Sequence, residues 1–130
     1  MFFKIRDVKI KKRTLIKLNG IFLQDNRINL LSGANGKGKT LLLKKIFDYG
    51  RREGLSIAYV DQRNDMILAH KAVLQNIAMT DNEEELERAR EILQKYGLEG
   101  FSNRNASKLS GGEKRLVSIL RCFFRTVKFF

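Results

Sequence analysis

The hydrophobic and polar positions divide the chain into a strand-rich beginning and a helical remainder. Apolar and charged residues partly alternate over Phe2 to Ile10 and again over Thr14 to Leu23. This alternation predicts two strands joined by the basic turn at residues 11–13. The short β-prone run from Arg27 to Leu31 leads directly into a glycine-rich segment that begins at Gly33. We expect a further strand at this run.

A helix and another strand are predicted after the glycine-rich segment. From Thr40 to Tyr49 the apolar residues recur at helical spacing, and Gly50 stands where a helix would end. Leu55 to Val60 has the pattern of a buried strand. The order strand, glycine loop, helix, strand is that of a βαβ unit, so we expect a parallel sheet as the core.

The pattern between residues 63 and 110 is helical. Asp81 followed by Glu84 forms a capping-box pair, an apolar face follows at helical spacing, and Gly97 ends the run. A last helix is predicted over about residues 110–124. The helical segment is therefore expected to be an insertion packed on the sheet domain.

Length and composition indicate one soluble globular domain. The chain has 130 residues, of which 43% are hydrophobic and 31% charged. No apolar run reaches the roughly 18 residues that a membrane-spanning helix needs, and the charged opening does not resemble a signal peptide. We therefore expect a cytoplasmic location. The single Cys122 cannot form an internal disulfide and is expected in the core.

The formal net charge of +12 raises the question of a nucleic-acid partner. The basic residues are spread along the chain, and the aromatic residues show no stacking-platform pattern of the kind that single-strand binders use. These two observations argue against nucleic acid as a partner.

Eight consecutive residues match the phosphate-binding pattern GxxxxGK[ST] without a mismatch. The glycines let backbone N–H groups turn toward phosphates, and the following helix adds the positive end of its dipole. Lys39 would reach the β- and γ-phosphates, and Thr40 would place a hydroxyl on Mg²⁺. An ordinary glycine turn is the alternative. The residues are Gly33, Ala34, Asn35, Gly36, Lys37, Gly38, Lys39 and Thr40.

A second motif, LSGGE, occupies residues 109–113. Ser110 and Glu113 form a capping box, which could simply begin a helix. A cap does not need Gly111 and Gly112 in its first turn, where glycine lowers helix stability. A backbone that must approach a phosphate closely does need them, so we favour a functional role.

These two motifs, in this order, resemble those of the ATP-binding subunit of an ABC transporter, and the similarity covers essentially the whole chain. The resemblance implies an α/β fold with a P-loop NTPase-type parallel sheet and an inserted helical subdomain, incomplete at the C-terminus. Residues 1–62 would form the sheet core and 63–109 the helical subdomain. Residues 110–130 would form the signature helix and the start of the Walker B strand.

The resemblance also assigns roles and partners. Tyr59 to Gln62 resemble the end of the second core strand and the Q-loop, with Gln62 as a catalytic residue that contacts Mg²⁺ and the attacking water; a surface amide is the alternative. Ser110, Gly111, Gly112 and Glu113 would bind the γ-phosphate of ATP held by a facing subunit. The implied ligands are ATP and Mg²⁺. The implied partners are a second cassette subunit and a membrane-spanning subunit, which would hold the chain at the inner face of the membrane.

Catalytic residues of the family are missing from this chain. They are an Asp and a Glu at the end of the Walker B strand and a later His. Family spacing puts residues 127–130 inside that strand, about two residues before the Asp. We therefore expect weak nucleotide binding and negligible ATP hydrolysis by this polypeptide. A translation-associated ATPase of the same superfamily and a catalytically dead truncated remnant remain alternatives.

Overall fold

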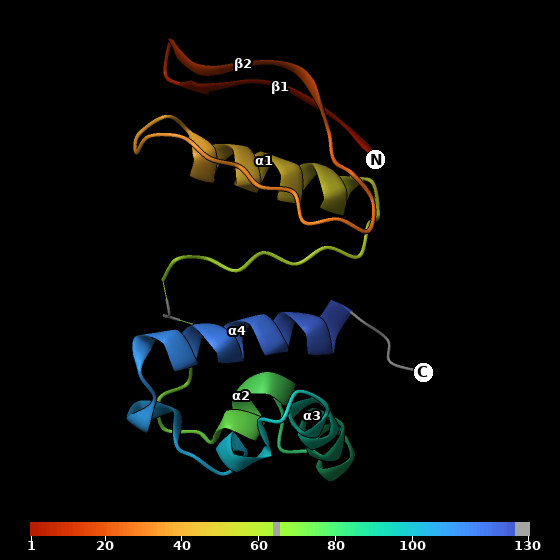
Figure 1. Ribbon diagram of the computed structural model, residues 1–130, viewed down its shortest axis with the longest axis vertical. Helices are drawn as coiled ribbons and strands as arrows, with labels where there is room; N and C mark the ends of the chain where they lie inside the picture. Colours follow the sequence, from red (N-terminus) through yellow and green to blue (C-terminus); the bar gives the residue numbers. More distant parts are fainter. Residues whose placement is uncertain (64–65, 127–130) are drawn as a thin grey trace. The chain divides into compact units, whose positions relative to one another are not determined.

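The computed structural model describes residues 1–63 and 66–126, and it divides into two compact units. The first unit is Met1–Ile57 and the second is Ala58–Phe130. Figure 1 shows the elements of each unit in chain order. The predicted start of a Walker B strand, residues 127–130, lies outside the described residues.

An antiparallel hairpin and one helix form the first unit. Strands β1 (Phe2–Ile10) and β2 (Arg13–Phe22) pair across a turn that contains Lys11 at φ 54°. The two predicted opening strands are confirmed. Phe3, Ile5 and Val8 of β1 are buried in one cluster with Leu42 of helix α1 (Lys39–Arg52), and a register shift between Arg6 and Val8 interrupts the alternation of buried residues. The hairpin lies along this helix (Figure 1).

Helix α1 is longer than its pattern predicts, because Gly50 does not end it. Gly50 is buried, and a Cβ at this position would lie 2.9 Å from Cδ1 of Ile57. The glycine therefore permits close packing of the returning chain against the helix. The left-handed residue just beyond the helix is Gly54, at φ 74°.

The predicted parallel sheet is not confirmed. In the described part of the chain the only sheet is the two-stranded β1-β2 hairpin. Neither 27–31 nor 55–60 forms a strand, and Ile28 and Leu30 are 99% and 89% exposed. A strand exists only when a neighbour completes its hydrogen-bond ladder, and these two segments have no such neighbour among the described residues.

The second unit is helical and has its own core. It contains α2 (Val73–Ala78), α3 (Glu83–Lys95) and α4 (Gly111–Thr126), with short 3-10 turns at Glu99–Phe101 and Ala106–Lys108. No described helix is both long enough and apolar enough to cross a bilayer. The core is built from side chains of all three helices, among them Val73, Ile77, Ala89, Leu93, Val117 and Leu120.

The start of α3 differs by one residue from the predicted capping box. Asn82 is the N-cap, and its Oδ1 accepts from Glu85 N at 3.2 Å. Asp81 instead accepts from Nε2 of Gln75 at 2.8 Å. Gly97 follows the helix at φ 69°, as its position predicts.

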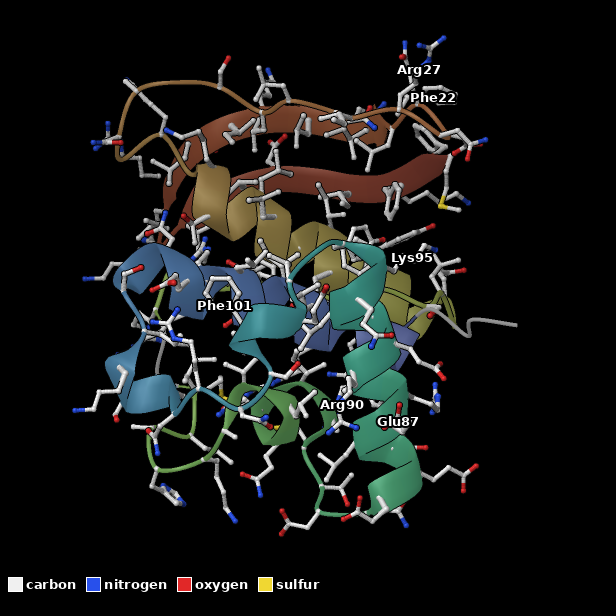
Figure 2. All side chains as sticks on the ribbon, turned by 60° about the horizontal axis from the view of Figure 1, so that its bottom comes forward. Phe22, Arg27, Glu87, Arg90, Lys95 and Phe101 are labelled. Carbon is white, nitrogen blue, oxygen red and sulfur yellow. The ribbon has the colours of Figure 1, made fainter. Side chains whose placement is uncertain are left out.

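Charged side chains cover the outer surface of α3. Arg90 donates to Glu87, and both project from this helix in Figure 2. Arg88 pairs with Glu85 at 2.8 Å. Ion pairs three residues apart are typical of a solvated helix face.

Candidate nucleotide-binding site

The phosphate-binding pattern forms a loop that leads into α1. Gly36 and Gly38 have φ of 77° and 92°, and Lys39 is the first helical residue. A left-handed backbone at two alternate positions favours glycine at both. A Cβ on Gly38 would also lie 3.2 Å from Cβ of Leu15, so β2 packs closely against this residue. The loop geometry thus depends on the hairpin as well as on the motif.

Lys39 folds back over the loop. Its Nζ donates to the carbonyl oxygen of Gly33 at 2.6 Å and to that of Ala34 at 2.7 Å. An ammonium group has three N–H donors, of which these bonds use two. The positive charge is therefore held among the residues that would surround a phosphate.

The N-terminus of α1 has no side-chain cap. Its N-cap is Gly38, no acidic residue occupies the first turn, and the first helical bond runs from Leu42 N to Gly38 O at 2.9 Å. Backbone N–H groups of the first turn consequently lack helical partners, and the positive end of the dipole is uncompensated. Thr40 is exposed in this turn. The arrangement suits a phosphate group with a cation beside it.

The LSGGE segment begins α4 in the second unit. Ser110 N donates to Oε1 of Glu113 at 2.9 Å, and Glu113 N donates to Oγ of Ser110 at 3.2 Å. The predicted capping box is confirmed. Arg104 Nη1 also donates to Oε2 of Glu113 at 3.0 Å. The hydrogen bond from the Ser110 backbone, followed by the Ser110 hydroxyl and Arg104, lowers the pKa of Glu113 despite an opposing effect of desolvation.

Gly111 and Gly112 have no packing role among the described residues. A Cβ at either position would meet nothing within 4 Å, and neither glycine has a positive φ. The unit would therefore accommodate alanine at both positions without strain. Since glycine costs helix stability relative to alanine, folding of this unit gives no reason for the pair.

Gln62 lies in an irregular segment of the second unit and is exposed. Its N–H donates to Oδ1 of Asp61 at 2.6 Å. Arg115 of α4 donates to the backbone carbonyl of Asp61. The helix that begins at LSGGE is thereby hydrogen-bonded to the residue preceding Gln62.

Arg121, which the sequence analysis did not single out, connects α4 to Asn76 of α2. Arg121 donates through Nε to the carbonyl oxygen of Asn76 at 2.7 Å and through Nη1 to that of Met66 at 2.8 Å. Asn76 is fully buried, and desolvation lowers the pKa of Arg121. The sequence feature that could have indicated this role is an arginine next to Leu120, beside the apolar side of a helix.

The predicted site residues thus form two groups. Residues 33–40 are contiguous in the first unit, whereas Gln62 and residues 110–113 belong to the second. Within the second unit, Arg115 connects the segment of Gln62 to the helix of the signature.

The model of one protein family, described as ABC transporter, matches residues 19–130. An ABC transporter ATP-binding protein of Haemophilus influenzae is 28% identical over 89% of this chain and 55% of its own length. Proteins of the same description from Methanopyrus kandleri and Pyrococcus horikoshii are 35% and 34% identical, over 67% and 83% of this chain and 41% of their own length in each case. The chain spans about half the length of these curated relatives or less.

No solved structure matches the chain. The family match covers most of the sequence, including the loop at residues 33–40 and the segment at 110–113. The chain belongs to the ABC transporter family.

Proposed function

We propose that the chain is an ATP-binding subunit of an ABC transporter and binds Mg-ATP through residues 33–40. The observation that carries this proposal is the position of Lys39, whose Nζ lies 2.6 Å from the Gly33 carbonyl oxygen at the uncapped start of α1. Backbone N–H groups and the ammonium would hold the β- and γ-phosphates. The curated relatives are named as ATP-binding proteins, which supports ATP as the nucleotide.

Mg²⁺ would bind at the same loop. The exposed Thr40 would supply a hydroxyl oxygen, with phosphate oxygens and water completing the octahedral shell. Gln62 would contribute its amide oxygen and orient the attacking water. The ion would neutralise charge on the phosphates when bound.

Nucleotide binding is tested by titrating a fluorescent ATP analogue into the 130-residue chain with Mg²⁺ present. Lys39→Ala is expected to weaken binding by at least about tenfold, because a charge-assisted phosphate contact is worth roughly 1.5–3 kcal/mol. Lys44→Ala is the control, since Lys44 is an exposed lysine of the same helix α1, outside the loop. Equal affinities for the two variants would contradict the proposal.

We further propose that residues 110–113 act on ATP held by a facing cassette subunit. Gly111 and Gly112 support this role, because an added Cβ at either one would point into open space in this unit. An exposed, side-chain-free helix start permits close approach of a partner's phosphate. A membrane-spanning subunit would complete the transporter and hold the chain at the inner face of the membrane.

Sedimentation velocity with and without Mg-ATP tests the facing arrangement. Nucleotide is expected to shift the chain, alone or with a second cassette, toward a dimer. Ser110→Arg should abolish this shift while leaving nucleotide binding to residues 33–40 unchanged. A dimer that forms equally well with Ser110→Arg would exclude the role of the signature in trans.

A further inference from the structure

The positive charge of the chain is concentrated in the first unit. Residues 1–57 contain 14 Lys and Arg but only 4 Asp and Glu, whereas residues 58–130 contain 12 and 10. The formal charges are therefore +10 and +2. The basic residues are spread along the chain, which argued against a nucleic-acid partner. The acidic residues are not, because most of them lie in the second unit, and the first unit therefore carries most of the net positive charge.

Two aromatic residues share the outer face of the hairpin. Phe2 and Phe22 are directly paired across β1 and β2, and their exposed fractions are 50% and 69%. Paired residues of antiparallel strands project to the same face of the sheet. Figure 2 shows Phe22 at the outer end of the hairpin. The hairpin thus creates an aromatic pair from residues 20 positions apart in the sequence.

Gly20 holds one of these rings in place. A Cβ on Gly20 would lie 2.2 Å from Cζ of Phe2, and Gly20 has φ 95°. The Phe2 ring therefore lies across the backbone of Gly20, where any side chain would displace it. An exposed ring fixed against backbone is ready to stack with another planar group.

Cationic side chains adjoin the aromatic pair. A shallow hollow of about 320 Å³ is lined by Phe2, Lys4, Ile5, Arg6, Asn19 and Gly20. Lys4 and Arg6 also line a groove of about 610 Å³ beside α1, together with Lys45, Arg51 and Arg52 and a single carboxylate, Asp48. The basic surface thus runs from the rings along β1 and down to the helix.

Within residues 1–63 and 66–126, the cations on β1 have no acidic partners. Neither Lys4 nor Arg6 forms an ion pair within the part of the chain that the structure describes. Arg51 and Arg52 occupy the last turn of α1, where their positive charges interact favourably with the negative end of the helix dipole. Lys4 and Arg6 lie on a strand, so no helix dipole accounts for their positive charge. An anionic partner would account for it.

We propose that the outer face of the β1-β2 hairpin binds single-stranded nucleic acid. Phe2, Lys4 and Arg6 are exposed at alternate positions of β1, while Phe3 and Ile5 between them are buried, so the three side chains share the outer face of the hairpin. The cations contact successive phosphates, and the rings of Phe2 and Phe22 stack with unpaired bases. An acidic peptide would use the cations alone, and a duplex would keep its bases away from the rings.

The test is fluorescence anisotropy of labelled oligothymidine and oligouridine of about 15 nucleotides, the upper part of the site size of one small domain. The 130-residue chain is titrated at about 50 to 200 mM salt. We expect binding that weakens with salt, and weaker binding of the duplex of equal length. Comparison of the two oligomers shows whether RNA or DNA is preferred.

Variants separate stacking from charge. Phe22→Leu keeps an apolar side chain but removes the ring, and is expected to weaken binding about 5- to 150-fold. The double variant Lys4→Glu, Arg6→Glu should weaken binding and reduce the salt slope by about 1.4 or more, since each phosphate contact contributes about 0.7. Tyr96→Leu and Lys108→Glu are matched controls on the exposed surface of the second unit and should bind as the unchanged chain does. Circular dichroism verifies that every variant is folded.

Several results would overturn the proposal. If ATP displaced the oligomer, or if Lys39→Ala no longer bound the oligomer, binding would be assigned to the phosphate loop instead. Equal affinity for polyglutamate or for duplex, or an unchanged affinity in Phe22→Leu, would show a general polyanion surface without base stacking. Absence of binding at the lowest salt concentration would equally exclude the site.

Discussion

Arg121 on α4 donates two hydrogen bonds to Asn76 on α2, one to its backbone oxygen and one to its side-chain oxygen. Nε donates to the Asn76 carbonyl oxygen at 2.7 Å and Nη2 donates to Oδ1 at 3.1 Å. Asn76 Oδ1 also accepts from Leu68 N at 2.7 Å. This buried pair joins α4 to α2, and Arg121 and Asn76 also hydrogen-bond to Met66 and Leu68 in the segment that follows Gln62.

Asn76→Ala should therefore be strongly destabilising. The change leaves the N–H of Leu68 and one N–H of Arg121 without acceptors in the core, and we expect a loss of about 3 kcal/mol in the free energy of unfolding. Urea unfolding followed by circular dichroism measures the loss. Asn103→Ala, on the exposed surface, is the control and should change stability by less than about 0.5 kcal/mol. A similar effect of both variants would show that the buried network contributes little.

Two glycines of the phosphate loop should respond differently to alanine. Both have positive φ, but a Cβ on Gly38 would press on Leu15, whereas a Cβ on Gly36 would meet nothing within 4 Å. We expect Gly36→Ala to cost about 1–2 kcal/mol from backbone strain alone, and Gly38→Ala to cost more. Thermal unfolding of both variants gives the difference. Equal costs would mean that β2 does not pack against the loop.

Gly112→Ala should stabilise the isolated chain. The added methyl group points into open space, and alanine favours a helix over glycine by up to about 1 kcal/mol. The same variant should weaken nucleotide-dependent dimer formation, because the methyl group would stand between the backbone and a partner's phosphate. A destabilised monomer would reveal a structural requirement for glycine and remove this support for a role in trans.

The capping box at Ser110 should make stability depend on pH. The pKa of Glu113 is lowered in the folded chain, chiefly by the hydrogen bond from Ser110 N. Its contribution is therefore fully present above the unfolded value of about 4.3 and is lost as the pH falls through the lowered folded value. Glu113→Gln should be less stable than the unchanged chain at neutral pH, and the gap should close in acid. Glu91→Gln, exposed on α3, is the control for thermal unfolding across this range and should show no such convergence.

The segment before the phosphate loop should behave as exposed apolar surface. Ile28 and Leu30 are almost completely exposed, and the predicted strand around them does not form. Ile28→Asn with Leu30→Asn should reduce binding of an environment-sensitive apolar dye while changing stability by less than about 0.5 kcal/mol. Val117→Asn, in the core, is the contrasting variant and should unfold the second unit. A large loss of stability in the double variant would show that another surface covers this segment in solution.

Local features of the fold were predictable because they depend on neighbours in the chain. The alternation of exposed and buried residues over 2–6, the capping box of Ser110 and the left-handed Gly97 follow from periodicity and short-range hydrogen bonds. The end of α1 was predicted wrongly, because it depends on a contact between segments that are not adjacent in the pattern. Glycine after a run of apolar residues at helical spacing usually marks the end of a helix. Gly50 instead lies within α1, where the absence of a side chain lets Ile57 pack closely, and a local pattern does not show such a contact.

The sequence by itself determined the family, and it predicted the phosphate loop at residues 33–40 and the signature at 109–113, because each motif is a contiguous run defined by residue type and spacing. Only the tertiary structure decided which residues meet at a distance. It brought Arg121 to Asn76 across 45 positions and paired Phe2 with Phe22 on an exposed face, and it left residues 27–31 without a strand partner. Strand ladders and buried polar contacts need a second segment in a defined place, and that placement results from burial of the whole core rather than from any local pattern.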